Sequence, residues 1–227
     1  MQYRKAVEGI FAKKLNRFVA EVYIDGELEK VHIKNTGRLT EILQPGAVLA
    51  LETSDNPNRK TRYSIIAARK GERWINIDSQ IPNQLVYDAL VAGNIQEFHG
   101  IRDLKREATF GNSRFDLFYY RGERGGFIEV KGVTLERDGL AMFPDAPTVR
   151  GRKHVETLIE AMQAGYEATV LFVIQMKGCH SFTPHYAMDP AFHEALQEAA
   201  HLGVRILAYE CYVTESTIQL DRPIPII

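Results

Sequence analysis

The fold is decided by one stretch, RFDLFYYRGERGGFIEVKGV, which covers residues 114–133. Its two halves, 114–120 and 126–133, are rich in aromatic and β-branched residues, which favour strands. Gly122 and Gly125 lie between the halves and are typical of a tight turn. The stretch therefore predicts a β-hairpin.

Two registers of this hairpin are open. If Gly122 and Glu123 form a two-residue type II′ loop, with the positive φ at Gly122, Asp116 lies opposite Glu129. If the loop is the four residues 122–125, Asp116 lies opposite Lys131. Side chains alternate along a strand, so either register places all three residues on one face. Only a bulge or an odd-numbered loop would separate them.

Two carboxylates at the distance of paired strands form a hard oxygen site. With the carbonyl of Val130, Asp116 and Glu129 are expected to hold Mg²⁺ or Mn²⁺, whose remaining ligands would be water and a substrate phosphate. Such an ion polarises a phosphate and activates water, while Lys131 could orient that water or offset charge on the phosphate. The same spacing also fits a solvated Glu-Lys pair on an exposed sheet face.

Composition describes an ordinary globular protein. The chain has 227 residues, is 45% hydrophobic and carries a net charge of -1. No apolar stretch approaches the roughly 20 residues of a membrane helix, and residues 1–14 lack the apolar segment of a signal peptide, so a cytoplasmic protein without membrane contact is expected. Cys179 and Cys211 have no metal-site spacing and are expected to be reduced thiols. Residues 1–80 have more basic than acidic side chains and residues 81–227 the reverse, a weak hint that the first part binds phosphate.

Residues 1–80 are expected to form an all-β domain. Strands are predicted over 17–24, 28–33, 48–53, 62–69 and 73–77, with one short helix over 39–43. Five strands in so short a segment suit an OB-fold barrel that binds nucleic acid, although an SH3-like barrel is also compatible.

Residues 81–227 are expected to form a mixed-sheet α/β domain. A helix over 83–92 and a strand over 104–109 precede the hairpin. A helix over 151–164, a strand over 168–174, a helix over 191–201 and a strand over 204–213 follow it.

The element order and the two acids resemble the PD-(D/E)xK nuclease superfamily. The whole chain more closely resembles the sugar fermentation stimulation protein A family. The matching stretches are His32-Ile33-Lys34-Asn35-Thr36-Gly37-Arg38, Asn112-Ser113-Arg114-Phe115-Asp116, Glu129-Val130-Lys131-Gly132-Val133-Thr134-Leu135, Phe143-Pro144-Asp145-Ala146, Arg150-Gly151-Arg152-Lys153-His154 and Phe172-Val173-Ile174-Gln175.

This resemblance implies an N-terminal OB-fold followed by a nuclease-like domain. It also implies DNA binding with little sequence preference, a role in regulating sugar metabolism and, through the domain, DNA cleavage. Two features depart from the superfamily pattern. Phe115 rather than proline precedes Asp116, and the first helix offers only Asp88 as an acid, which could act in an outer shell.

Further residues are candidates for contact with nucleic acid. Lys34, Asn35 and Arg38 follow a barrel strand and could contact phosphates. Arg114 belongs to a matching stretch. Arg150, Lys153 and His154 cluster at a helix start, where backbone amides favour anions, although a solvated helix entry is equally compatible.

Several polar and aromatic residues have competing interpretations. Gln175 ends a buried strand and could bond a metal-bound water or the substrate, or could be an ordinary polar residue at a strand end. Phe18, Tyr23 and Trp74 could stack on bases or belong to the core. His180, His185 and His193 lack the spacing of a zinc site.

The sequence leaves three functions to compare. The first is a DNA-binding protein with a Mg²⁺- or Mn²⁺-dependent phosphodiester hydrolase site. The second is a DNA-binding regulator linked to sugar metabolism that does not cleave. The third is a protein-interaction module without a nucleic-acid role. The oligomeric state stays open, with a homodimer as one option.

Overall fold

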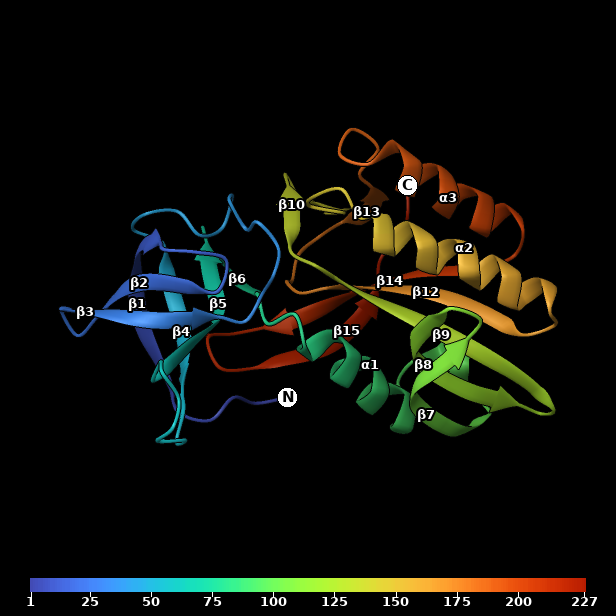
Figure 1. The fold of residues 1–227 in the computed structure, drawn as a ribbon, viewed down its shortest axis with the longest axis horizontal. Coiled ribbons are helices and arrows are strands. Elements are labelled where there is room, and N and C mark those ends of the chain that lie inside the picture. The colour runs from blue at the N-terminus through green and yellow to red at the C-terminus, as the bar shows by residue number, and fades with distance from the viewer.

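A computed structural model describes all 227 residues of the protein. The N-terminal part is a barrel, and the larger α/β part lies beside it (Figure 1). The barrel strands are β1 (Ala6–Lys14), β2 (Val19–Ile24), β3 (Glu27–Ile33), β4 (Val48–Thr53), β5 (Tyr63–Lys70) and β6 (Arg73–Asn76). Five of them, in the order β3-β2-β1-β4-β5, form a ring that closes where His32 and Ile33 of β3 pair with Ser64 and Ile65 of β5.

The barrel contains the predicted number of strands but not the predicted set. Strand β1 is not among the predicted strands, and the prediction that residues 73–77 belong to the closed barrel is wrong. Strand β6 pairs only with the second half of β5, outside the closed ring. Gly9 in β1 allows close packing, since a Cβ there would lie 2.7 Å from Val22. The predicted helix over 39–43 is a turn in which Leu39 has a φ of 52°.

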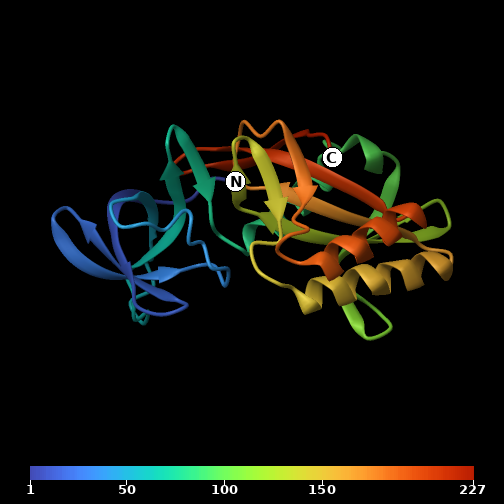
Figure 2. The ribbon, with the colours of Figure 1, turned by 90° about the horizontal axis from the view of Figure 1, so that it is seen from above.

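The α/β part is built on a six-stranded sheet with the order β15-β14-β12-β9-β8-β7. One helix, α1, lies against one face, and α2 and α3 cover the other side by side (Figures 1 and 2). A small sheet, β10-β11-β13, flanks them. The elements are α1 (Ile81–Val91), the 3₁₀ turn Gln96–Phe98, β7 (Ile101–Phe110), β8 (Ser113–Arg121), β9 (Arg124–Val133), β10 (Leu135–Arg137), β11 (Leu140–Phe143), α2 (Val149–Gln163), β12 (Glu167–Ile174), β13 (Ser181–Pro184), α3 (Pro190–His201), β14 (Arg205–Val213) and β15 (Ile218–Pro223).

The predicted hairpin is formed by β8 and β9 with the two-residue loop. Arg121 pairs with Arg124 and Leu117 with Ile128. Gly122 has a φ of 58°, the positive value that the first position of a type II′ turn needs. Of the two open registers, this one directs Asp116 towards Glu129. In the parallel neighbour β12, Val170 lies beside Glu129, so Glu129 lies on an interior strand flanked by β8 and β12.

Ion pairs join the barrel to the α/β part. Lys70 of β5 donates to the carbonyl oxygen of Glu136 at 2.7 Å and to its carboxylate at 3.0 Å. Arg137 of β10 contacts Glu41 of the barrel domain at 2.9 Å. A cavity of about 200 Å³ lies between these contacts. The buried hydrophobic core also continues across this junction. None of the helices is long and apolar enough to cross a membrane.

Candidate metal centre

Glu129 lies in the centre of β9 with only 3% of its surface exposed. Its Oε1 atom accepts hydrogen bonds from Lys131 Nζ and His154 Nδ1, both at 2.5 Å. Its Oε2 atom is buried and has no hydrogen-bond partner. An unsatisfied carboxylate oxygen in the interior is costly, so this atom is available for a ligand.

Asp116 lies across from Glu129 on β8. Its Oδ2 accepts the backbone amide of Val130 at 2.8 Å, and its Oδ1 accepts the side-chain amide of Asn83 at 2.6 Å. The backbone pairing of β8 with β9 ends at Leu117, so the carboxylate takes the place of the next ladder partner. Because the N-H and C=O of an extended residue leave the strand on the same side, the Val130 carbonyl also points towards Asp116.

The alternation of side chains is interrupted at Asp116. Phe115 packs on the α2 face against His154, whereas Leu117 belongs to the cluster on the α1 face. Glu129 and Lys131 share the α2 face, but the prediction that alternation places Asp116 on that face with them is wrong, although the loop has two residues. The Asp116 side chain instead lies between β8 and β9. One of its oxygens accepts from the Val130 amide of β9 and the other from Asn83 of α1.

The two carboxylates have opposite electrostatic environments. Burial, reinforced by the charge of Glu129, raises the pKa of Asp116 to about 6. Burial also opposes ionisation of Glu129, but the hydrogen bond from His154 and the Lys131 ammonium outweigh it and hold the pKa of Glu129 below its usual range. Neighbouring carboxylates with separated pKa values are typical of functional sites.

These donors fit a hard divalent cation. Two carboxylates and a backbone carbonyl provide the oxygen ligands that Mg²⁺ and Mn²⁺ prefer. The unpaired Glu129 Oε2 is the atom that such an ion would satisfy. A cleft of about 310 Å³ opens beside Asp116 and is lined by Asn83, Arg106, Glu107 and Leu117.

The predicted basic contacts near α2 differ in exposure: one is buried and three are exposed. His154 is 6% exposed and bonds Glu129, so it lies inside the site rather than on the surface. Arg150 Nε lies 3.5 Å from His154 Nε2, and Lys153 donates to the Asn112 carbonyl at 3.4 Å. Arg114 is exposed, 3.6 Å from Glu107.

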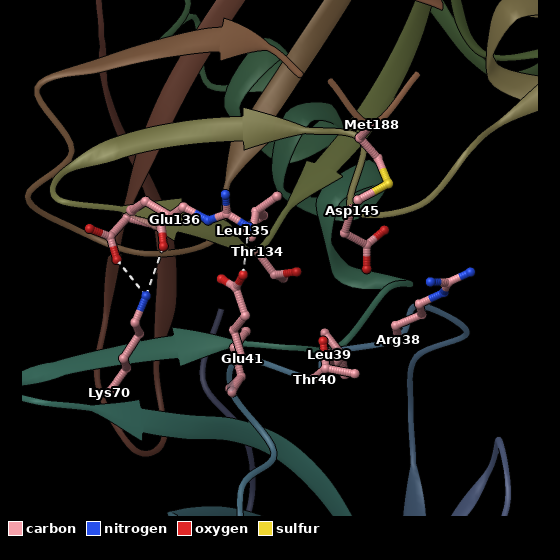
Figure 3. A pocket seen from close by; sticks show the side chains of 12 residues that line it. Arg38, Leu39, Thr40, Glu41, Lys70, Thr134, Leu135, Glu136, Asp145 and Met188 are labelled. Carbon is pink, nitrogen blue, oxygen red and sulfur yellow. Dashed lines mark hydrogen bonds and ion pairs between the residues drawn. The ribbon is translucent and has the colours of Figure 1, made fainter. Parts of the chain in front are cut away.

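The other predicted site residues make no hydrogen bond to either carboxylate. Lys34 forms ion pairs with Glu52 and Asp78, and Asn35 bonds the backbone of Ile77 and Gly37. Arg38 lines the junction cavity (Figure 3). Gln175 donates to Asn76 and to the carbonyl of Asp78. Phe18 and Tyr23 are each 48% exposed, while Trp74 packs against the core.

Sequence reasoning missed two features of the site. Asp88 is exposed and bonded to Gln84, and Asn83, five residues earlier, is the α1 residue that reaches Asp116. The inward position of His154 could have been found, because it lies on the same helical stripe as Val155 and Leu158. No sequence signal marks Asn83 beyond its place at the start of the helix.

The barrel and the helix-flanked sheet together define a two-domain protein, in which a five-stranded OB-like barrel precedes a mixed-sheet α/β domain. Residues 13–77 match the model of the SfsA N-terminal OB domain, and residues 80–217 match that of the sugar fermentation stimulation protein RE domain. The chain belongs to the sugar fermentation stimulation protein (SfsA) family. The fold and the family expected from the sequence are thereby confirmed.

Relatives and a solved structure cover nearly the whole chain. A sugar fermentation stimulation protein homolog of Alkaliphilus oremlandii is 52% identical over 228 residues, which cover 98% of this chain and 97% of the relative. A homolog of Clostridium botulinum is 53% identical over 218 residues, covering 95% and 94%. The structure of Pyrococcus furiosus SfsA in complex with Ca²⁺ is 29% identical, with a TM-score of 0.90 and coverage of 100% and 98%.

Proposed function

We propose that this protein binds DNA with little sequence preference and hydrolyses its phosphodiester bonds with a divalent cation. Asp116, Glu129 and the carbonyl of Val130 would hold Mg²⁺ or Mn²⁺. The observation that carries the proposal is the buried Glu129 Oε2, which has no hydrogen-bond partner although the partly buried carboxylate of Asp116 lies on the neighbouring strand. A cation is the partner that satisfies such a pair, because both carboxylates can remain ionised around it.

Each residue of the site has a distinct task. The bound ion would polarise the phosphate and lower the pKa of a bound water. Lys131 and His154 hold Oε1 of Glu129, which leaves Oε2 free to face the ion. Asn83 and the Val130 amide fix both oxygens of Asp116. Gln175 Nε2 is fixed by Asn76 and by the carbonyl of Asp78, so Gln175 would act through its Oε1, which accepts no hydrogen bond within the protein.

Two observations support the choice of metal and substrate. The relative from Pyrococcus furiosus was solved in complex with Ca²⁺, a hard cation that takes oxygen ligands as Mg²⁺ does. Phe18 and Tyr23 are exposed on the barrel, where aromatic rings can stack on unpaired bases. DNA is the substrate that the family resemblance implies.

Cleavage and metal affinity test the proposal together. Purified protein is incubated with single-stranded, duplex and branched DNA in Mn²⁺, and Mn²⁺ binding is followed by calorimetry. Asp116→Asn and Glu129→Gln should each weaken Mn²⁺ binding and slow cleavage about a hundredfold or more. Asp138→Asn, an exposed carboxylate in the turn between β10 and β11, is the matched control and should change neither. Cleavage that persists in Asp116→Asn would remove this residue from the reaction.

One observation favours a second candidate, a regulator that binds DNA without cutting it. The α1 residue at the site is the neutral Asn83, so the centre has two carboxylates and no third acid. Such a centre could bind a cation for structural reasons only. This function predicts salt-sensitive DNA binding without turnover on any substrate, whereas the hydrolase predicts products that appear only with metal.

A further inference from the structure

Arg106 differs from the other arginines of β7 and β8 in having no carboxylate partner. The others form ion pairs: Arg102 with Asp103 and Glu123, Arg114 with Glu107, and Arg121 with Glu167. Arg106 makes only neutral contacts, although it lies one residue from Glu107. Its charge is therefore unmatched within the protein.

Two residues of α1 hold the Arg106 guanidinium in place. It lies 4.1 Å from the centre of the Tyr87 ring and donates to Gln84 Oε1 at 2.8 Å. Stacking and a planar hydrogen bond preorganise an arginine without neutralising it. A flexible surface arginine loses conformational entropy when it binds a ligand. Because Arg106 is already held in one conformation, this loss on binding is smaller.

The backbone of β7 departs from regular strand geometry around Arg106. Asp103 and Glu107 have φ values of 53° and 55°, in the left-handed region that disfavours residues other than glycine. The pairing of β7 with β8 also shifts between Arg102 and Lys105. Irregularities of this kind redirect side chains and are common at the edges of sheets beside active sites. Here Glu107 pairs with Arg114, and Arg106 lies over α1.

Arg106, which has no carboxylate partner, lies at the cleft that leads to Asp116. Arg106, Asn83 and Asp116 line the same opening of about 310 Å³. Lys131 is the cation that counters the charge of Asp116, so Arg106 is not needed for that purpose. An unpaired, preorganised guanidinium at the entrance of a carboxylate site suits an anion that approaches from solvent, and a phosphate diester matches its planar donors.

We propose that Arg106 binds one backbone phosphate of DNA at the entrance of the Asp116 cleft. This inference rests on the proposed function, because it takes nucleic acid as the ligand. The contact positions the strand beside the two carboxylates and reads no base. It is a positioning contact, separate from the residues that would hold the cation.

DNA affinity in EDTA tests this contact without cleavage or metal. Fluorescence anisotropy with a labelled duplex is measured over a series of salt concentrations. Arg106→Gln should weaken binding roughly tenfold and reduce the slope of log affinity against log salt by about 1. Arg106→Lys should restore part of the affinity, since lysine keeps the charge but loses the stacked fork. Arg102→Gln on the same strand is the control and should have little effect, because its charge is already paired.

The outcomes separate this inference from the proposed function. Equal effects of Arg106→Gln and Arg102→Gln, or an unchanged salt slope in Arg106→Gln, would overturn the phosphate contact while leaving cleavage by the wild type intact. Arg106-dependent binding by a protein that never cleaves would support the contact and reject the hydrolase. A wild-type protein that binds no DNA would overturn both. Thermal melting of each variant shows whether an affinity change reflects unfolding.

Discussion

Lys34 in the barrel and Glu129 in the α/β domain are both charged residues with little access to solvent, yet their partners differ. Lys34 Nζ reaches Glu52 at 2.7 Å and Asp78 at 3.2 Å, so its charge is matched inside the protein. Glu129 has two donors on one oxygen and none on the other. A matched charge stabilises the fold, whereas an unmatched atom is available to a ligand.

The largest effect is expected at Asp116, whose ionised form is unfavourable without metal. Asp116→Asn should stabilise the metal-free protein by about 3 kcal/mol at pH 8, the size of a pKa shift from 3.8 to about 6. The asparagine can still accept the Val130 amide and can donate to a flipped Asn83 amide. If Asp116 serves the proposed reaction, it does so at a cost in stability, which is a common trade-off in active sites.

The pH dependence of this gain has a defined sign. The folded-state pKa of Asp116 lies above the unfolded value, so between about pH 4 and pH 6 the native state binds more protons than the unfolded state. The contribution of Asp116 to stability is therefore complete below about pH 4 and is lost as the pH rises through 6. Urea unfolding in EDTA should show a difference between variant and wild type that grows over this window. A difference that is constant with pH would contradict the environment described for Asp116.

An effect of opposite sign is expected at Lys34. Lys34→Met should destabilise the protein by about 2 kcal/mol, because it leaves Asp78, which is 2% exposed, without its cation. The partial exposure of Lys34 and Glu52 keeps this figure below that of a fully buried pair. Urea unfolding at neutral pH measures it.

The same variant tests the role in DNA binding that the sequence suggested for Lys34. If its charge is already matched, Lys34→Met should weaken DNA binding no more than Lys30→Met, which removes an exposed lysine of β3. A much larger loss of DNA affinity in Lys34→Met, with stability unchanged, would make Lys34 a phosphate contact. It would contradict the view that its ion pairs with Glu52 and Asp78 leave Lys34 no charge to offer a ligand.

The predicted elements that held have strong local signals. The β8-β9 hairpin follows from the glycines of its loop, and α2 and α3 follow from helical periodicity. Strand β1 has a weak local signal, because Gly9 and the exposed Ile10 interrupt its alternation of apolar and polar residues. Its pairing with β2 and β4 is a long-range property that the local sequence does not show. The closure of β3 on β5 is likewise set by tertiary packing. Local patterns in the sequence therefore do not show which five strands form the closed barrel.

The candidate site divides in the same way. Period-two alternation is a local rule, and it correctly predicts that Glu129 and Lys131 share a face, but it does not give the position of Asp116. The break in alternation at Asp116 depends on the Val130 amide and on α1, and no local pattern encodes either contact. His154 was taken for a surface cation because its neighbours Arg150 and Lys153 are basic. Its burial follows from the docking of α2 on β8 and β9.

The smallest effect is expected at His154, which touches the site only through Glu129. Its Nδ1 must donate, because the ionised Glu129 can only accept, and its Nε2 then accepts from Arg150. His154→Ala should therefore lower Mn²⁺ affinity roughly tenfold, as loss of an outer-shell partner of a metal ligand typically does. His154→Asn can place its amide nitrogen near the former Nδ1 and should recover much of that affinity. Calorimetry with Mn²⁺ distinguishes the two variants, and stability measured in EDTA serves as the control. If His154→Ala and His154→Asn lowered Mn²⁺ affinity equally, packing rather than the hydrogen bond would hold Glu129 in place. The availability of Oε2 would then not depend on the two hydrogen bonds to Oε1.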